Sequence, residues 1–150
     1  MLSIIRATGT HDDFKQLTQL LDADLNARYG TLQAMYDQYN VIESIETVVI
    51  AYLDQLPVGC GGIKRYDPAT VELKRMYVRP EHRGKGVAVR LLAELETWAC
   101  ELGFSAMILE TGRKQAEAIG LYTKNGYQPI ENYGQYQGVA NSVCFRKGLA

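Results

Sequence analysis

The stretch RPEHRGKGVAVRLL (residues 79–92) places basic side chains and two glycines directly before a long apolar run. Gly84 and Gly86 let the backbone turn with its N–H groups unshielded, and the helix predicted to follow adds the unpaired N–H groups of its first turn. These donors lie at the positive end of a helix dipole, where an anion is stabilised. Because Arg83 and Lys85 add positive charge, a phosphate or pyrophosphate is the expected guest. The alternative is a simple glycine turn with solvated basic side chains.

Two other phosphate-binding motifs do not occur in the chain. The GxxxxGK[ST] pattern of nucleoside triphosphate P-loops is absent, and no GxGxxG dinucleotide fingerprint follows a predicted strand. The 16 Lys and Arg residues against 17 Asp and Glu residues give a formal net charge of -1. We therefore expect no nucleic-acid partner and no membrane partner, and any anion recognition should be local.

Apolar periodicity predicts the elements that must position this loop. Apolar residues recur at helical spacing from Val87 to Leu102, and Gly103 is predicted to end that helix. Further helices are expected over residues 11–25, 29–39 and 115–125. Strands are expected over residues 3–7, 46–54, 57–66, 71–78, 105–111, 127–130 and 142–147. Because strands outnumber helices and cluster in the middle, an α/β (α+β) fold with a mixed sheet is predicted rather than a doubly wound fold.

The strand VELKRMYV (residues 71–78) changes the phase of its period-2 pattern. Its apolar residues fall at Val71 and Leu73 and then at Met76 and Val78. One extra residue between Leu73 and Met76 would explain this shift. The sequence thus predicts a β-bulge in this strand.

Length and composition indicate one compact domain over residues 1–150. The start MLSIIRATGTHDDF is unlike a signal peptide, and no apolar run approaches the roughly 20 residues that span a bilayer, so we expect a cytoplasmic location. Cys60, Cys100 and Cys144 are odd in number and lack a CxxC spacing. They are predicted to be small core residues rather than a disulfide framework or a metal site.

The sequence resembles the GCN5-related N-acetyltransferase family in three stretches. RGKGVA (residues 83–88) fits the family's acetyl-CoA signature [QR]-x-x-G-x-[GA], ELKRMYV precedes it, and ETGRKQAEAIGLYTKNGY follows it and ends in the pattern LY-x-K-x-G-[FY]. Together they cover residues 72–127 in the family's order. The resemblance implies a six- or seven-stranded sheet flanked by about four helices, with a bulged fourth strand splayed from the fifth. It also implies an enzyme that transfers the acetyl group of acetyl-CoA to a primary amine of a small molecule or peptide, by direct attack in a ternary complex.

The resemblance further implies how coenzyme A is held. Its pyrophosphate would lie on backbone N–H groups of residues 83–88, and its pantetheine arm would pair with the main chain beside the bulge like an added strand. The cofactor-binding residues implied are Met76, Tyr77, Val78, Arg83, Gly84, Lys85, Gly86, Val87, Ala88 and Gln115. Gln115 stands where the family often has an asparagine, so a solvated polar residue is the alternative there.

The same resemblance implies the catalytic groups. Glu72 lies four residues before Met76, where the family often carries its general base, and Tyr122 lies where the family commonly holds a tyrosine near the sulfur. A main-chain N–H at or near Met76 would bind the oxyanion. An exposed strand carboxylate paired with a lysine is the alternative for Glu72, and a core tyrosine is the alternative for Tyr122.

The acceptor site is the least specified part of the chain. In the family it is walled by the first two helices and the loop between the last strands, which implies Arg28, Tyr29, Tyr36, Tyr133, Tyr136 and Asn141. Tyrosines suit a pocket for a small polar or aromatic amine, and they suit the interface of a homodimer equally well. Arg28 could hold a carboxylate or pair with Asp24. His11 and His82 belong to no motif, and His82 is expected at the surface.

An acyl-CoA-binding or sensing domain without catalysis is the alternative function. Such a domain would keep the features of residues 76–88 but would have no need of Glu72 and Tyr122. The presence of both residues favours an enzyme.

Overall fold

The computed structural model describes residues 1–29 and 45–149, and within these ranges it contains a seven-stranded sheet. The strands are β1 (Leu2–Ala7), β2 (Thr47–Leu53), β3 (Leu56–Asp67), β4 (Thr70–Val78), β5 (Ala106–Gly112), β6 (Gln128–Ile130) and β7 (Ser142–Gly148). Each agrees with a predicted strand to within two residues at either end. The predicted sheet of six or seven strands is thus confirmed.

The described α-helices are α1 (Asp12–Tyr29), α3 (Val87–Glu101) and α4 (Ala116–Lys124). Short 3-10 turns occupy Pro80–His82 and Gly134–Tyr136. The helix expected over residues 29–39 lies outside the described residues except for Tyr29, which ends α1. At the other end of α1, the ring Nδ1 of His11 accepts a hydrogen bond from the backbone N–H of Asp13 at 3.1 Å, so His11 caps this helix.

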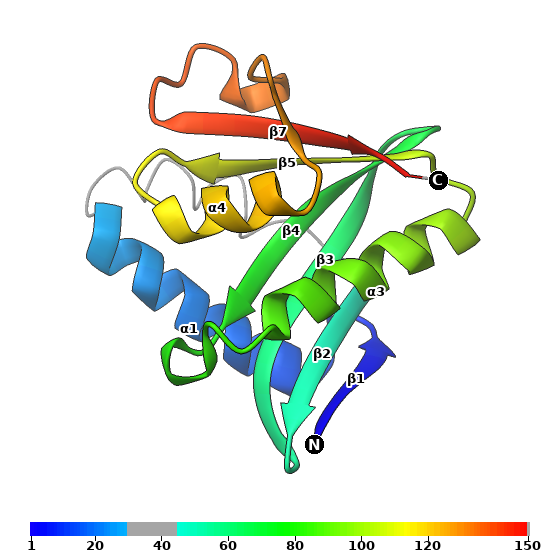
Figure 1. Cartoon of the computed structure of the whole chain (residues 1–150), viewed down its shortest axis with the longest axis vertical. Helices are drawn as coiled ribbons and strands as arrows, with labels where there is room; N and C mark the ends of the chain where they lie inside the picture. Colours follow the sequence, from blue (N-terminus) through cyan, green and yellow to red (C-terminus); the bar gives the residue numbers. More distant parts are fainter. Residues whose placement is uncertain (30–44, 150) are drawn as a thin grey trace.

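The sheet order is β1-β2-β3-β4-β5-β7-β6, and neighbouring strands are antiparallel except for β4 and β5. The parallel pairing of β4 with β5 runs only from Thr70 opposite Ala106 to Glu72 opposite Ile108. Beyond that point the two strands separate, so the sheet opens into a V (Figure 1). This confirms the predicted splaying of the fourth strand from the fifth.

The predicted bulge lies in β4. Lys74 pairs with Gly62 and Tyr77 with Cys60, so three steps along β4 match two steps along β3. Arg75 lies in the bulge and has a φ of 59°, in the left-handed region that non-glycine residues rarely occupy. Its guanidinium pairs with Asp22 of α1 at 2.5 Å, which ties the bulge to the helix packed on that face.

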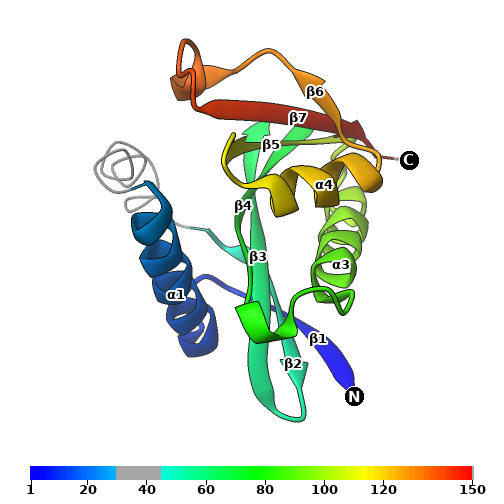
Figure 2. The ribbon, with the colours of Figure 1, turned by 60° about the vertical axis from the view of Figure 1, so that its left-hand side comes forward.

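The helices cover opposite faces of the sheet. Phe14 and Leu17 of α1 pack with one group of buried residues, which includes Ile50 and Cys60. The helices α3 and α4 pack on the other face, where Leu91, Leu92, Leu95 and Ala99 join the larger buried cluster. Figure 2 shows α1 and α3 on the two sides of the strands. No helix among residues 1–29 and 45–149 is both long enough and apolar enough to cross a membrane.

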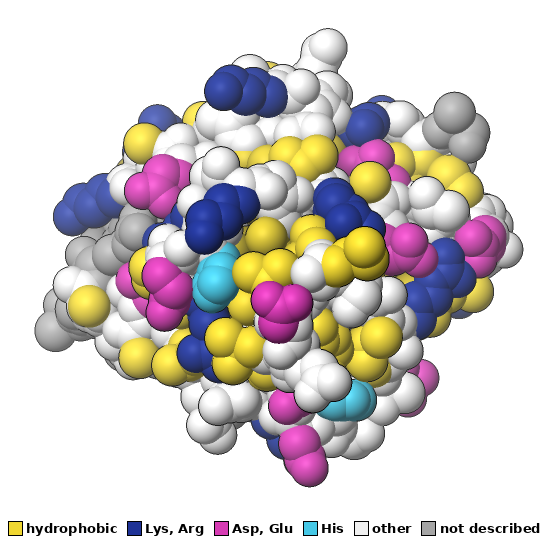
Figure 3. Space-filling view, turned by 60° about the horizontal axis from the view of Figure 1, so that its bottom comes forward, with side chains coloured by type: hydrophobic (Ala, Val, Ile, Leu, Met, Phe, Trp, Pro, Cys, Tyr) yellow, Lys and Arg dark blue, Asp and Glu magenta, His cyan; other side chains and the backbone are white. Residues whose placement is uncertain are grey.

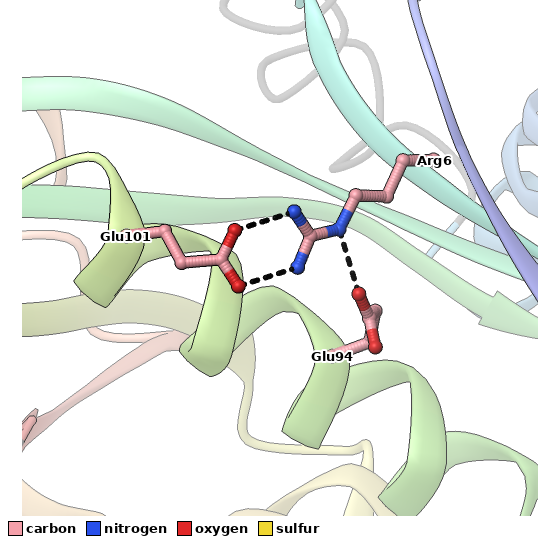
Figure 4. A network of polar contacts seen from close by, with 3 residues as sticks. All are labelled: Arg6, Glu94 and Glu101. Carbon is pink, nitrogen blue, oxygen red and sulfur yellow. Dashed lines mark hydrogen bonds and ion pairs between the residues drawn. The ribbon is translucent and has the colours of Figure 1, made fainter.

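Arg6 fastens the edge strand β1 to α3 (Figure 4). Its Nε donates to Glu94 at 2.7 Å, and its two terminal nitrogens donate to the Glu101 carboxylate at 2.7 and 3.1 Å. Its guanidinium also lies 4.8 Å from the centre of the Trp98 ring. The fork of the guanidinium matches a carboxylate and stacks on an aromatic face at once, which a lysine ammonium cannot do.

The cysteines are free thiols in the part of the chain that the structure describes. Cys60 and Cys144 are buried, and burial raises the pKa of Cys60 to about 12. Both are core residues, as predicted, whereas Cys100 is partly exposed.

Candidate functional site

The loop between β4 and α3 has the form expected of an anion site. Gly84 and Gly86 have φ angles of 78° and 82°, and a Cβ at either position would meet no atom within 4 Å. Gly86 is the N-cap of α3, and no side chain among the described residues caps that end. The space beside the two glycines at the start of α3 is therefore open, and a phosphate there can approach the N–H groups that a helix leaves unpaired in its first turn.

Arg83 lies at the start of this loop, between α1 and α4. Its Nε donates to the carbonyl of Val78 at 2.8 Å, and its guanidinium lies 5.6 Å from the centre of the Tyr77 ring. Its other nitrogens lie 3.7 Å from Asp24 of α1 and 3.7 Å from Glu117 of α4. Arg83 thus places a cation between the two helices that flank the open V, whereas Lys85 is exposed at the tip of the loop.

The separation of β4 from β5 leaves a strand edge that faces the opening. The pairing of the two strands ends at Glu72 and Ile108, and Met76 and Val78 lie beyond it on β4. The Met76 side chain packs against the larger core cluster, and the Val78 side chain is part of it. Their side chains are therefore core residues while their main chain lies along the opening, where an amide-bearing ligand could pair with it.

A cleft of about 1050 Å³ joins the anion loop to the opening and continues to the face covered by α1. Its lining includes nine of the ten predicted cofactor-binding residues, all except Lys85. Gln115 lines the cleft as the N-cap residue of α4, and its side chain makes no cap hydrogen bond. Loop, strand edge and cleft together fit a ligand that has a pyrophosphate at one end and an amide-bearing arm.

The view from below shows the surface around this region (Figure 3). Hydrophobic side chains gather near its centre, and Lys and Arg side chains stand beside Asp and Glu side chains around them. This face thus carries mixed charge and no broad basic surface.

Tyr122 reaches the cleft from α4. Its ring packs against Tyr127 and Phe145 at centroid distances of 5.7 and 6.3 Å, and 5% of the residue is exposed. Burial and, secondarily, the charge of Glu110 raise the pKa of Tyr122 above its usual value. The phenol therefore stays protonated at neutral pH and can donate a proton or hydrogen bond into the cleft.

Glu72 lies on the α1 side of the sheet and is buried, with 7% exposed. One of its oxygens accepts a hydrogen bond from the Tyr133 hydroxyl at 2.6 Å, and the other lies 3.5 Å from the Lys74 ammonium. Lys74 also lies 3.4 Å from the Tyr136 hydroxyl. The lysine pairing expected as the alternative for Glu72 is present, but it is buried rather than solvated.

Glu110 on β5 is a second carboxylate of the cleft, and sequence reasoning missed it. It accepts a hydrogen bond from the Ser142 hydroxyl at 2.7 Å. Burial raises the pKa of Glu110 to about 7, while Ser142 and Lys74 oppose this rise. The available signal was a glutamate directly after the apolar run AMIL (residues 106–109), because acidic residues are rarely buried without a role.

The predicted acceptor wall is only partly described. Arg28 and Tyr29 lie in the last turn of α1, but their side chains, like Tyr36, lie outside what the structure describes. Tyr136 lines the cleft, and the Tyr133 hydroxyl donates a hydrogen bond to Glu72. Asn141 lies directly before β7, and its Nδ2 is buried with no hydrogen-bond partner among the described residues. Ring contacts join Tyr66, Tyr133 and Tyr136 at 5.3 and 5.6 Å.

His82 is partly exposed and lines the cleft beside Arg83. Its Nδ1 is buried without a partner among the described residues. The same part of the chain contains no group of three His, Cys, Asp or Glu side chains that could hold a metal ion.

Comparison with known proteins finds matches along nearly the whole chain. A model of the acetyltransferase (GNAT) family matches residues 14–127. An IAA acetyltransferase of Azospirillum brasilense is 33% identical over 150 residues, which make up 99% of this chain and 98% of that relative.

Solved structures agree with this relationship. A Klebsiella pneumoniae protein provisionally named an acyl-CoA N-acyltransferase has a TM-score of 0.83 and 32% identity, covering 100% of this chain and 99% of its own. A GNAT family acetyltransferase from Elizabethkingia anophelis, solved with acetyl-CoA bound, has a TM-score of 0.72 and 17% identity, covering 99% and 98% of the two chains. At 17% identity, the likeness to the Elizabethkingia anophelis protein shows a shared fold.

Proposed function

Because the chain belongs to the acetyltransferase (GNAT) family, we propose that residues 1–150 form one acetyl-CoA-dependent N-acetyltransferase domain. Its acceptor would be the primary amine of a small molecule or peptide, attacking directly in a ternary complex. One observation carries the proposal: a cleft runs from an open glycine loop to the gap between β4 and β5, and its lining includes the buried Tyr122 and the carboxylates of Glu72 and Glu110.

Bound acetyl-CoA would supply an acetyl group activated as a thioester. The backbone N–H groups of residues 83–88 would hold its pyrophosphate, with Arg83 turning from Asp24 and Glu117 toward the phosphate charge. The main chain of β4 beside Met76 would pair with the pantetheine arm and offer a hydrogen bond to the acetyl oxygen.

The transfer needs two proton movements. The neutral amine nitrogen forms a bond to the acetyl carbon, the carbon–sulfur bond breaks, and the nitrogen loses one proton while the sulfur gains one. We assign the proton to sulfur to the Tyr122 hydroxyl, which burial keeps protonated. The proton from nitrogen goes to a carboxylate, directly or through water.

Glu72 and Glu110 are the two candidates for that carboxylate. Glu72 was predicted from the sequence, but its oxygens are engaged by Tyr133 and Lys74, and it lies where β4 and β5 are still paired. Glu110 lies two residues past the last pair, and its pKa of about 7 suits a base at neutral pH. These features favour Glu110, with Glu72 as the alternative base.

A thiol-release assay tests the activity. Acetyl-CoA and a panel of primary amines are mixed with the protein, and a thiol reagent follows free coenzyme A. An enzyme gives amine-dependent thiol release, whereas the alternative binding domain binds acetyl-CoA without releasing thiol.

Paired glycine variants test the anion loop. Gly86→Asp puts a carboxylate into the proposed phosphate site and should abolish acetyl-CoA binding in calorimetry. Gly103→Asp is the matched control, because Gly103 also has a positive φ and a Cβ there would meet no atom within 4 Å, but it follows the C-terminal end of α3. Near-normal affinity in Gly86→Asp, or equal losses in both variants, would count against the loop.

A further inference from the structure

Lys74 and Glu110 lie at equivalent positions on the two strands that diverge. Glu72 and Ile108 form the last pair of the parallel register, and Lys74 and Glu110 follow them by two residues on their respective strands. The residues between, Leu73 and Leu109, belong to the core under α3. Because side chains alternate along a strand, Lys74 and Glu110 point to the opposite face, the one covered by α1.

This arrangement places a cation and a carboxylate on the two sides of the opening. Lys74 is 7% exposed and, like Glu110, lines the cleft. Its ammonium lies 3.5 Å from Glu72 and 3.4 Å from the Tyr136 hydroxyl, with the Tyr136 ring centre at 5.8 Å. Glu110 is held by Ser142 on its own side. Each charged group is thus anchored before any acceptor arrives.

A buried ammonium beside the reacting amine constrains what can bind there. Lys74 already has the Glu72 carboxylate at 3.5 Å, and an acceptor whose only polar group is its amine would place its nitrogen nearby without adding further negative charge. An acceptor that also carries a carboxylate matches both sides of the opening, since its acid group can join Lys74 while its amine faces Glu110. Charge-assisted hydrogen bonds of this kind are the stronger ones in proteins.

We propose that the acceptor is a small zwitterion, an α-amino acid or close analogue, whose carboxylate binds Lys74 and whose amine faces Glu110. This inference rests on the proposed acetyltransferase function and names its substrate class. During the transfer the amine nitrogen bonds to the acetyl carbon and gives its proton to the base, while the carbon–sulfur bond breaks and the sulfur takes a proton from Tyr122. The carboxylate on Lys74 does not react. Leu21, Leu25 and Tyr136 also line the cleft and offer apolar surface to the acceptor's side chain.

Matched sets of amines test the proposal on the wild-type protein. Phenylalanine is compared with phenylalaninamide and phenethylamine, and leucine with leucinamide and isoamylamine, each with acetyl-CoA and each over a range of pH so that the free-amine fraction is known. We expect kcat/KM, expressed per free amine, to favour the acids by roughly 10- to 100-fold, the usual contribution of a hydrogen bond to a charged group. Equal or better use of the amides and simple amines would overturn the proposal.

Variants of Lys74 show whether that residue causes the preference. Lys74→Met and Lys74→Gln should lose the preference for acids while keeping acetyl-CoA affinity, and Lys74→Arg should keep much of it. Lys15→Met removes an exposed lysine of α1 outside the cleft and should leave the preference unchanged. A preference that persists in folded Lys74→Met or Lys74→Gln would show that another group binds the acid.

The two levels of the proposal fail differently. If amines are acetylated without regard to a carboxylate, the acetyltransferase function stands and the zwitterionic acceptor is wrong. If no amine releases thiol although acetyl-CoA binds, the proposed function fails, and the inference about the acceptor fails with it.

Discussion

Tyr122 combines a buried ring with access to the cleft, so its hydroxyl can be tested apart from its packing. Tyr122→Phe keeps the ring contacts with Tyr127 and Phe145 and removes only the proton donor. We expect acetyl-CoA affinity to change little in calorimetry, while turnover falls by roughly 100-fold, a typical general-acid contribution. Full turnover with the best amine would remove Tyr122 from the chemistry.

Glu110 and Glu72 are distinguished by the pH dependence of kcat/KM. With Glu110 as the base, the wild-type rate should rise through about pH 7 as Glu110 loses its proton. Glu110→Gln should lose this rise and recover only at higher pH, where free amine becomes abundant without help. Glu72→Gln should keep this rise at a somewhat lower pH, because the charge of Glu72 contributes to the raised pKa of Glu110, and its overall rate should fall. The opposite pattern would assign the base to Glu72.

Among the elements, the contact of β1 with α3 offers a test of stability far from the chemistry. Arg6→Met removes the fork to Glu101, the bond to Glu94 and the stacking on Trp98, whereas Arg6→Lys keeps only a charge. Both variants should lower the melting temperature, Arg6→Met by more, and added salt should narrow the difference between Arg6→Lys and wild type. Thermal unfolding followed by circular dichroism measures these melting temperatures. An unchanged melting temperature in Arg6→Met would show that the contacts of Arg6 add nothing to stability.

Elements with a regular apolar pattern could be predicted closely from the sequence. The spacing of α3 and the glycine after it placed its ends within a residue, and the phase change between Leu73 and Met76 located the bulge. Both features depend on neighbours along the chain. The pairing of β4 with β5 that ends at Glu72 and Ile108 is a contact between distant segments, and the resemblance to the family implied only that these two strands are splayed.

The acceptor side could not be read in the same way. Whether a strand carboxylate is buried depends on what covers its face of the sheet, and Glu110 is enclosed by residues far away in sequence, Ser142 among them. The partial burial of His82 likewise depends on how the loop before α3 folds against the cleft. The charge and the apolar periodicity of a segment do not show which distant residues will bury it.

At the scale of the whole molecule, Glu110 should make folding stability depend on pH. Its pKa is raised from 4.5 to about 7 in the folded state, so the folded chain binds this proton more tightly than the unfolded chain does. The resulting stabilisation is present in full below pH 4.5 and is lost as pH rises through about 7. Its size is up to about 3 kcal/mol, from the energy of one pKa unit and the size of the shift.

Glu110→Gln should flatten that dependence, since glutamine cannot ionise. Relative to wild type, the variant should gain stability as pH rises from about 5 to about 8, even though we expect it to be a poorer catalyst. Urea unfolding at several pH values measures the difference. Parallel curves for the two proteins would mean that Glu110 titrates as it does in the unfolded chain.

The opening between β4 and β5 also bears on self-association. A strand edge with unpaired main-chain groups can recruit a strand from another molecule, which is the usual start of sheet aggregation. At one outer edge, β6 has three residues and contains Pro129, so it is a poor template. The inner edges lie in a cleft lined by residues of both α1 and α4. These helices leave less room beside the inner edges for a second polypeptide strand with its side chains than for the narrow ligand arm proposed to pair there.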